Sequence, residues 1–479
     1  MKIMPLGGTT KEEIERRLQV VAAAGNISRA EGTVSQVYES RNDYESNLKL
    51  IKAVLSYGHR SIAEHDYIVF GLEDVTPIVE QTIIGYRLTS FTIKSRRNVD
   101  FRNVGFYVPD FKDKDGNVLA RNEELKDVYK GYMQSLFNKY GDLVDEELPV
   151  EDCRYILPYS YYSNIIMGCD ANELLRITSD LLYGKNSYID ELKELGMHFK
   201  GLIEKYVPYL LPSLDKESKS ELYTDKFGFM DTYLNQAGIK YDGLLDGPNM
   251  TNYTKDADKV VIINILKNRY QISYEEAEDL LITLNFRDPN IEPKLIDALL
   301  HSKNQRELEH VIFSFEMPIS LAVLTHITRH RMHSLMVPDF VPMWNLENYV
   351  TPDTIKKNHE NDYDEIFAQN KIMFEYFKEQ GVRDEDLVYF YLSGNACNIS
   401  TTMNARNLEW VSRMRCCNKA QWEIRHLMQS CVEQASAVSP LMAKMFGPYC
   451  TVMGYCPEGK DSCKNRGVVT KKLENKDSK

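Results

Sequence analysis

Apolar positions along this chain follow the spacing of amphipathic helices and of short buried strands. Residues 47–59 place leucine, isoleucine and valine on one stripe before Gly58, which predicts a helix that stops there. The apolar runs at 67–72 and 311–315 predict strands. Residues 360–380 and 420–438 predict two further helices. The mixture indicates an α/β (α+β) fold in which a β-sheet packs against long helices.

The same pattern occurs twice. IAEHDYIVFGLEDVTPIVEQTIIGYRLTSF and ELEHVIFSFEMPISLAVLTHITRHRMHSL share Glu-His, alternating apolar residues, a proline, an apolar stretch and Arg-x-x-Ser. The offset is about 245 residues, roughly half the chain, which indicates a tandem duplication. We therefore expect a first copy at 1–227, a linker rich in Gly, Asn and Asp at 228–256, a second copy at 257–449, and a cysteine-containing C-terminal tail at 450–479.

The composition and net charge limit the classes of protein to which this chain could belong. Hydrophobic residues make up 43% and charged residues 27%, as in globular proteins. The net charge of −12 and the pI of about 5.5 argue against a general nucleic-acid binder, so any anion site should be local. No apolar run has the length of a membrane span, and the N-terminus lacks the apolar segment of a signal peptide. We expect a cytoplasmic protein that binds neither nucleic acid nor membrane.

Nine cysteines are scattered along the chain, and the odd number favours reduced thiols. Cys450, Cys456 and Cys463 lie close together in the tail and could serve zinc with Cys416 or Cys417 as a fourth ligand. Their spacing differs from that of a zinc knuckle. We therefore expect a plain surface tail without a metal.

A basic cluster at 329–333 follows an apolar stretch in this acidic chain. Guanidinium groups can bind phosphate or polarise a heteroaromatic ring through paired hydrogen bonds. The alternative is a solvated helix end, where cations complement the helix dipole. Arg329-His330-Arg331-x-x-Ser334 resembles the opening of the signature of flavin-dependent thymidylate synthases, Arg-His-Arg-x-x-Ser-x-Asn-Glu-x-Ser-x-Arg-Tyr.

Further segments resemble the same family, in the same order along the chain. They are Gly58-His59-Arg60-Ser61 with Glu64-His65, the run EDCRYILP at 151–158, Asn404-Ala405-Arg406 with Arg415, and AQWEIR at 420–425. No Gly-x-Gly-x-x-Gly follows a strand, so the chain is not a Rossmann dinucleotide binder. This agrees with a family that binds flavin without that fold.

The two copies depart from the signature in complementary ways. The second copy keeps Arg329, His330, Arg331 and Ser334 but has Val341 where the final arginine belongs. The first copy has Gly85 and Tyr86 in place of Arg-His but keeps Arg87, Ser90, Ser95 and Arg97. At the positions that correspond to Asn404, Arg406 and Arg415 of the second copy, the first copy has Asp170, Asn172 and Leu181. Members of the family form homotetramers with sites built from several subunits, so the resemblance implies composite sites in a homodimer of two-copy chains. The alternative is that both copies have decayed and only the fold remains.

The resemblance assigns roles to individual residues. It implies FAD contacts from His59, Arg87, Ser90, Arg329, His330, Arg331, Ser334, Asn404 and Arg406. It implies nucleotide contacts from Ser95, Arg96, Arg97, Arg329 and Arg415, with Ser95 and Arg97 on the phosphate. Among these, Ser95, Arg329 and Arg415 would take part in catalysis, with Arg415 stabilising negative charge on the pyrimidine ring. A helix over 404–415 would place Asn404 and Arg415 on one side.

The activity implied is reductive methylation of dUMP to dTMP with methylenetetrahydrofolate, FAD and NADPH. One departure leaves alternatives open, because the glutamate of the signature is Ile93 in one copy and Val337 in the other. The substrate could be a different pyrimidine nucleotide, modified at C5 through flavin. A non-catalytic homologue that binds flavin or nucleotide is the third possibility.

Overall fold

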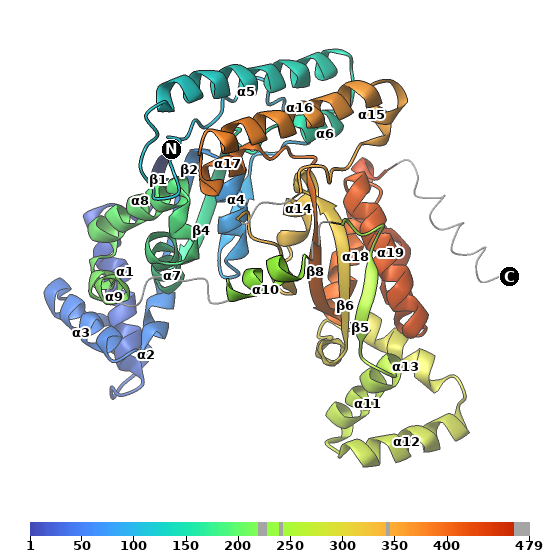
Figure 1. The fold of residues 1–479 in the computed structure, drawn as a ribbon. Helices are drawn as coiled ribbons and strands as arrows, with labels where there is room; N and C mark the ends of the chain where they lie inside the picture. The colour runs from blue at the N-terminus through green and yellow to red at the C-terminus, as the bar shows by residue number, and fades with distance from the viewer. Residues whose placement is uncertain (219–227, 239–242, 342–344, 464–479) are drawn as a thin grey trace. The chain divides into compact units, whose positions relative to one another are not determined.

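Two four-stranded antiparallel sheets with the same strand order form the framework of this computed structural model (Figure 1), which describes residues 1–218, 228–238, 243–341 and 345–463. The first sheet has the order β1 (Lys2–Pro5), β2 (Tyr67–Val75), β4 (Ser163–Asp170), β3 (Ser90–Ile93). The second has the order β5 (Asn249–Tyr253), β6 (Ile312–Ser320), β8 (Ala396–Asn404), β7 (Ser334–Met336). The predicted duplication and the α+β class are confirmed.

Equivalent helices follow equivalent strands. α4 (Pro77–Gly85) follows β2 as α14 (Leu321–Thr328) follows β6. α7 (Ala171–Tyr183) follows β4 as α18 (Ala405–Arg415) follows β8, and each is capped by the last residue of its strand, Asp170 or Asn404. α8 (Asp190–Tyr206) and α19 (Trp422–Val438) come next. The helix predicted at 420–438 and the strands predicted at 67–72 and 311–315 are therefore present.

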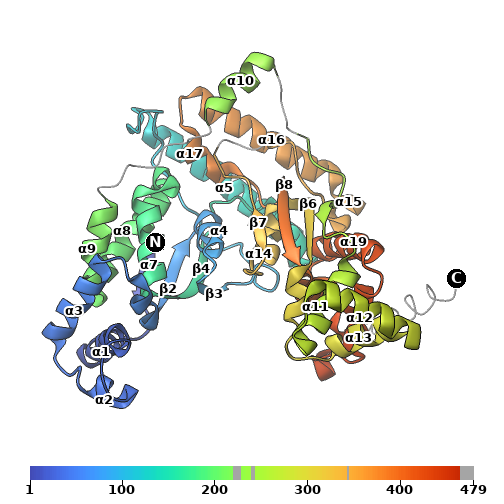
Figure 2. The ribbon, with the colours of Figure 1, turned by 90° about the horizontal axis from the view of Figure 1, so that it is seen from below.

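Three helices that precede the second strand of each copy's sheet also correspond in order between the halves. The N-terminal layer of the first copy has α1 (Lys11–Ile27), α2 (Val34–Glu39) and α3 (Tyr44–Ser56), and Gly58 after α3 has a φ of +88°. This left-handed φ is the helix stop that the sequence predicted. The second copy has α11 (Ala257–Tyr270), α12 (Tyr274–Arg287) and α13 (Ile291–Leu300), which lie together in Figure 2.

The chain forms two compact units that do not follow the two halves of the sequence. One contains residues 1–242, 340–347 and 351–393, and the other contains 243–339, 348–350 and 394–479. The long helices α5 (Asn122–Asp145) and α16 (Glu360–Glu379) thus belong to one unit although they come from different copies. The helix predicted at 360–380 is α16. The stretch 228–256, expected as a linker, includes α10 (Phe229–Ala237) and β5.

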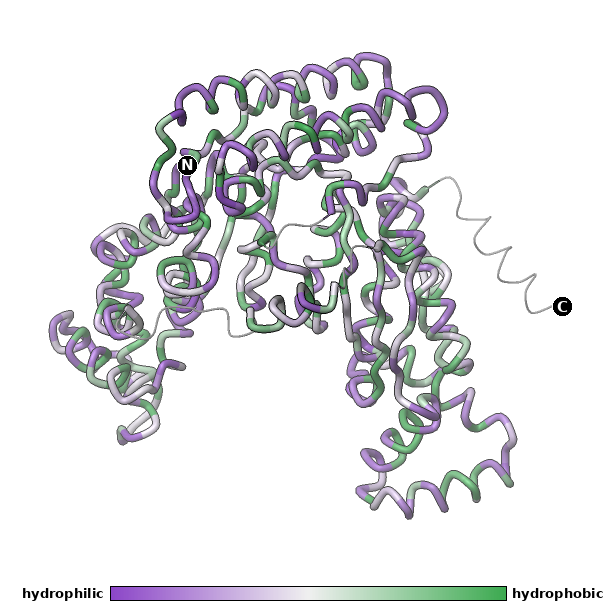
Figure 3. Tube along the Cα trace, in the orientation of Figure 1, coloured by the Kyte–Doolittle hydropathy of each residue, from purple (hydrophilic) through white to green (hydrophobic). Residues whose placement is uncertain are grey.

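Aromatic side chains join α5 to α16. The ring of Phe377 lies 4.9 Å from Phe111 and 4.9 Å from Phe390, and Tyr129 lies 5.3 Å from Phe390, between ring centroids. Hydrophobic and hydrophilic residues alternate along both helices in Figure 3, as expected when one stripe is buried and the other is solvated. Burial of this aromatic stripe keeps α16 in the first unit.

A buried ion pair fixes the start of β2 in the same unit. Asp66 is 1% exposed, and its carboxylate accepts hydrogen bonds from Arg17 Nη1 at 2.7 Å and from Tyr209 Oη at 2.6 Å. Arg17 also donates to the carbonyls of Gly8 and Tyr206. One carboxylate therefore ties together the N-terminal segment, β2 and the end of α8.

Replacing Asp66 with alanine should lower the free energy of unfolding by about 3 kcal/mol, because the mostly buried guanidinium of Arg17 would lose its counter-ion. Urea unfolding measures the loss. The control is Glu73→Ala, which removes an exposed pair with Lys2 and should cost less than about 1 kcal/mol. Equal losses in the two variants would show that the Asp66 network does not stabilise the fold.

Candidate active site

The basic cluster lies where α14 ends and the edge strand β7 begins. Arg329 is the C-cap residue of α14, and its backbone N–H donates to the carbonyl of Ile327. His330 and Arg331 follow, and Ser334 opens β7 opposite Thr402 of β8. The four signature residues of the second copy are thus brought together in one short connection between a helix and a strand.

His330 makes a direct contact with the predicted residue Arg415. Arg415 Nε donates to His330 Nε2 over 2.9 Å, which joins the end of α18 to the basic cluster. Because Nε2 accepts this bond, the neutral imidazole carries its proton on Nδ1. Burial, followed by the charges of Arg415 and Arg329, lowers the pKa of His330 to about 3. The uncharged imidazole of His330 therefore lies near Arg415 and Arg329 and orients the guanidinium of Arg415.

His333 holds the connection between α14 and β7 against β8. The ring is 4% exposed, with Nδ1 at 2.6 Å from Thr401 Oγ1 and Nε2 at 3.3 Å from the carbonyl of Ile327. Since a carbonyl only accepts, Nε2 is the donor and Nδ1 accepts from the threonine hydroxyl. Asn407 Nδ2 adds a hydrogen bond to the carbonyl of Met332 at 3.1 Å. The connection is thereby fixed to β8 and α18.

The helix predicted over 404–415 is present as α18, and Asn404 is its N-cap residue, accepting a hydrogen bond from the backbone of Asn407 at 2.8 Å. Arg406, in the first turn, pairs with Glu309 at 2.5 Å. Arg415 closes the last turn, so about 16 Å of helix axis separates it from Asn404. Residues at the two ends of α18 would thus meet different parts of a ligand.

In the first copy, the predicted phosphate ligands follow β3. Arg97 Nε pairs with Glu151 at 2.6 Å, and both side chains are about one-third exposed. Arg96 is buried, with Nη1 at 3.1 Å from the carboxylate of Glu80 and in contact with the hydroxyl of Tyr161. Ser95 is partly exposed beside them and accepts the backbone N–H of Val99 through its carbonyl.

A third arginine, Arg154, belongs to this cluster, although the sequence had not singled it out as a ligand. It is 2% exposed, its Nε donates to the carbonyl of Glu151, and its Nη2 is buried without a hydrogen-bond partner. Burial lowers the pKa of Arg154 to about 10, and the nearby charges of Arg96 and Arg97 act in the same direction. In the sequence, Arg154 lies in the run EDCRYILP, one of the segments of resemblance, which does not by itself assign a role to the arginine.

Three guanidinium groups thus lie near one another, with Glu80 paired to Arg96 and Glu151 paired to Arg97. A buried guanidinium nitrogen without a partner is costly unless an anion or water meets it. A phosphate group, which accepts several charge-assisted hydrogen bonds, fits these donors. We call Ser95, Arg96, Arg97 and Arg154 the arginine cluster.

His59, Arg87 and Ser90 lie on other elements of the first unit. His59 directly precedes the 3₁₀ helix Arg60–His65 and is exposed. Arg87 is exposed in the turn after α4, and Ser90 is exposed at the start of β3, opposite Gly168. Arg87 and Ser90 therefore precede the arginine cluster on one continuous segment, whereas His59 comes from a separate connection.

The positions that correspond to each cluster in the opposite copy are filled by other contacts. Tyr86 stands where the second copy has His330, and its hydroxyl donates to Asp180 while the guanidinium of Arg176 lies 5.2 Å from its ring. Phe340 stands near the place of Arg96, and its ring lies 6.3 Å from Tyr391 and 6.0 Å from Tyr159. The first copy thus has a buried tyrosine at the place of His330 while it keeps Arg87 and Ser90, and the second copy has a phenylalanine packed on tyrosines near the place of Arg96.

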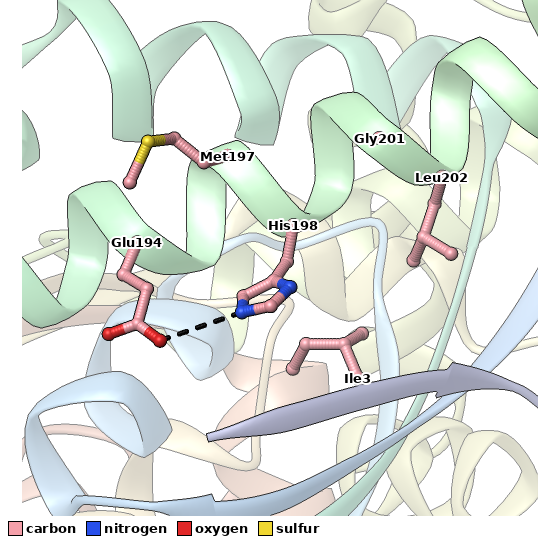
Figure 4. Close-up of a pocket in the computed structure, with 6 residues that line it drawn as sticks. All are labelled: Ile3, Glu194, Met197, His198, Gly201 and Leu202. Atoms are coloured by element: carbon pink, nitrogen blue, oxygen red, sulfur yellow. Dashed lines mark ion pairs between the residues drawn. The ribbon is translucent and has the colours of Figure 1, made fainter.

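A separate pocket of about 430 Å³ lies between β1 and α8 (Figure 4). Figure 4 shows His198 turned toward Glu194 of the same helix, at 3.5 Å, with Ile3 facing them from β1. None of the predicted site residues lines this pocket. Among the residues described, no group of three or more His, Cys, Asp or Glu side chains is arranged to hold a metal ion, and no helix is long and apolar enough to cross a membrane.

The family model of thymidylate synthase complementing proteins (Thy1) matches the chain twice, at residues 12–193 and 249–441. The chain belongs to this family. The flavin-dependent thymidylate synthase of Sulfurisphaera tokodaii is 31% identical over 213 residues, which cover 42% of this chain and 78% of that protein. The flavin-dependent thymidylate synthase of Sulfolobus acidocaldarius is 30% identical over 209 residues, which cover 42% and 77%.

Two solved structures are also similar to part of this Thy1 chain. Thymidylate synthase X from Helicobacter pylori, solved with FAD and dUMP, is 18% identical and covers 43% of this chain and 93% of its own, with a TM-score of 0.30. The UMP/dUMP methylase PolB from Streptomyces cacaoi, solved with 5-Br dUMP, is 25% identical and covers 37% and 76%, with a TM-score of 0.30.

The neutral state of His330 predicts an acid-dependent loss of stability. Between pH 6.5, its ordinary pKa, and about pH 3, its pKa in the folded chain, the unfolded chain binds a proton that the folded chain does not. Stability should therefore fall as the pH drops through this window. His330→Asn should remove this contribution, so that urea midpoints at about pH 7.5 and 5.5 differ less in the variant than in the wild type. Identical pH dependence in both proteins would contradict the assignment.

Proposed function

We propose that this Thy1 chain catalyses the reductive methylation of dUMP to dTMP, with methylenetetrahydrofolate as the one-carbon donor and NADPH as the source of electrons through FAD. The observation that supports this most directly is the division of two cation clusters between the copies. Each cluster has the chemistry of one ligand, and each lacks a working counterpart in the other half. Decay of both copies would not preserve complementary sets.

The arginine cluster is proposed to hold the phosphate of the nucleotide. Arg97 is partly exposed, and its guanidinium can exchange Glu151 for a phosphate oxygen. The buried Nη2 of Arg154 offers a donor that the protein leaves unpaired. The hydroxyl of Ser95 supplies a neutral donor beside them. A dianion would relieve the repulsion among the three guanidinium groups, which is a reason for affinity beyond the hydrogen bonds alone.

The basic cluster of the second copy is proposed to hold the flavin. Arg329 and Arg331 supply charge for a pyrophosphate, and the neutral His330 can lie against an aromatic ring without adding a third charge. His59, Arg87, Ser90, Ser334, Asn404 and Arg406 are the further flavin contacts proposed from the family signature. FAD, when bound, would supply the hydride, while these side chains bind and orient it.

Arg415 is proposed to face the pyrimidine. Its Nε is occupied by His330, so the fork of terminal nitrogens is directed by that bond. A guanidinium fixed in this way can stabilise negative charge on the pyrimidine carbonyl while the ring is attacked. Ser95 and Arg329 complete the set that we propose to act in catalysis. Arg96 is buried with Glu80, and we propose that it shapes the phosphate site.

The organisation of the chain is part of the proposal. Residues 1–227 and 257–449 would be the two synthase copies, with 228–256 between them and 450–479 as a tail whose residues 464–479 lie outside the described part. A homodimer of two-copy chains, in the cytoplasm, would then take the place of a tetramer of single-copy chains. Each working site would draw its residues from both kinds of copy.

A different pyrimidine nucleotide is the alternative substrate, and one observation favours keeping it. Ile93, which replaces the signature glutamate in the first copy, is 7% exposed and pairs with Ile165 in the sheet. No carboxylate is therefore available at that place. A non-catalytic homologue remains the third possibility, and it would bind flavin without NADPH-dependent reduction of its absorbance band.

The purified protein should reduce its flavin with NADPH and convert dUMP to dTMP when methylenetetrahydrofolate is present, which mass spectrometry of the nucleotide detects. Flavin reduction with a product other than dTMP from another pyrimidine nucleotide would favour the alternative. Absence of flavin from protein refolded or reconstituted with FAD would overturn both.

Arg97→Ala should raise the KM for the nucleotide about 30-fold or more and leave the Kd for FAD unchanged, because it removes a charged phosphate contact. Arg331→Ala should raise the Kd for FAD and leave the KM for the nucleotide unchanged. The control is Arg102→Ala, which breaks exposed ion pairs with Asp100 and Asp145 five residues beyond Arg97 and should leave both constants unchanged. Equal effects of the Arg97 and Arg331 variants on both ligands would contradict the division of roles.

A further inference from the structure

A buried glutamate holds the start of the helix that leads to the signature segment, and it does so in both copies. Glu423 and Glu191 each lie in the first turn of the long helix after the sheet, α19 or α8. Each carboxylate binds the N-cap residue of the preceding short helix, α14 or α4. Glu423 belongs to the segment AQWEIR at 420–425, whose glutamate has no role among the contacts proposed above.

In the second copy, the partner is Ser320. Glu423 Oε1 accepts the backbone N–H of Ser320 at 2.7 Å, and Oε2 accepts its hydroxyl at 2.7 Å. Glu423 is 6% exposed and Ser320 is fully buried. The backbone N–H groups of Glu423 and Ile424 are themselves capped by Gln421, so the carboxylate lies near the N-terminal ends of both α19 and α14. Negative charge is favourable at both ends.

In the first copy, the partner is Thr76. Glu191 accepts the backbone N–H of Thr76 at 3.0 Å and its hydroxyl at 2.6 Å, and Tyr389 donates a third hydrogen bond at 3.1 Å. Glu191 is 1% exposed and Thr76 is fully buried. Two carboxylates in equivalent places therefore make the same pair of hydrogen bonds to the residue that joins a strand to a helix.

The two ties lead to different segments. α14 runs from Ser320 to Arg329, His330 and Arg331, so Glu423 fixes the near end of the helix whose far end carries the basic cluster. Arg415 holds that far end through His330. α4 begins after Thr76 and ends at Gly85 and Tyr86, which carry no such cluster. The chain then continues through Arg87 and β3 to the arginine cluster.

We propose that Glu423 is a positioning residue for the flavin site and Glu191 a positioning residue for the nucleotide-phosphate site, each acting through the serine or threonine that begins its helix. This inference rests on the function proposed above. A short rigid helix transmits a shift at its first residue to its last, and a misplacement of about 1 Å at a reacting centre can cost about 100-fold in rate. The two glutamates are thereby assigned to different ligands although their own contacts are alike.

The test compares Glu423→Gln with Glu191→Gln, measured at about pH 8 because burial raises the pKa of Glu191 to about 7. An amide keeps the size of the side chain, but it removes the negative charge between the two helix ends and offers one acceptor oxygen in place of two. Glu423→Gln should raise the Kd for FAD about tenfold or more and raise the KM for the nucleotide by less, because α14 leads to more of the proposed flavin contacts than of the nucleotide contacts. Glu191→Gln should raise the KM for the nucleotide more than the Kd for FAD, because α4 leads to Arg87 and Ser90 and then to the whole arginine cluster. Urea midpoints should fall in both variants.

The pattern across the two constants distinguishes positioning from a general loss of stability. Loss of stability alone would change the two constants in the same ratio in both variants, or change neither, and this result would overturn the inference. Glu423→Asp and Glu191→Asp, which keep the charge on a shorter side chain, should recover part of the lost binding. If the wild-type protein binds neither FAD nor nucleotide, the proposed function fails first, and this result is distinct from wild-type binding with variants that behave alike.

Discussion

Repulsion between guanidinium groups is the constraint on which the rest of this structure depends. Two clusters of arginines must be held in a chain that is acidic overall, and each cluster needs groups that hold the cations without neutralising them. In the first copy, Glu80 and Glu151 offset two of three arginines. In the second, the neutral His330 accepts a hydrogen bond from Arg415 and orients its guanidinium.

Duplication explains why the two solutions occur in different copies. Each sheet has the same strand order, and each strand-to-helix turn is tied by a buried glutamate, so the frameworks have stayed alike. The surfaces have diverged. Tyr86 with Asp180 fills the place of the basic cluster in the first copy, and Phe340 with Tyr391 fills the place of the arginine cluster in the second. The framework is present in both copies, whereas each of the two cation clusters is present in one copy. This fits the proposal that each copy supplies half of a site.

The sequence predicted the elements well and the contacts poorly, for a physical reason. Apolar periodicity is local, so the helix of residues 420–438 and the stop at Gly58 could be read directly. The bond between His330 and Arg415 joins residues 85 apart, and nothing local specifies it. Arg154 could not be separated from a surface arginine until its burial and its unpaired Nη2 were known. The placement of α16 in the first unit depends on aromatic packing with α5, such as that of Phe377 on Tyr129, which the local sequence pattern does not specify.

The central claim is that each chain keeps one flavin cluster and one phosphate cluster. Binding stoichiometry tests it most directly, with FAD measured by its absorbance per chain and dUMP by isothermal titration of the flavin-loaded protein. The account predicts one FAD and one dUMP for each chain. Two of either ligand per chain would show that the counterpart positions around Tyr86 or Phe340 still bind, and would contradict the division of the site between the copies.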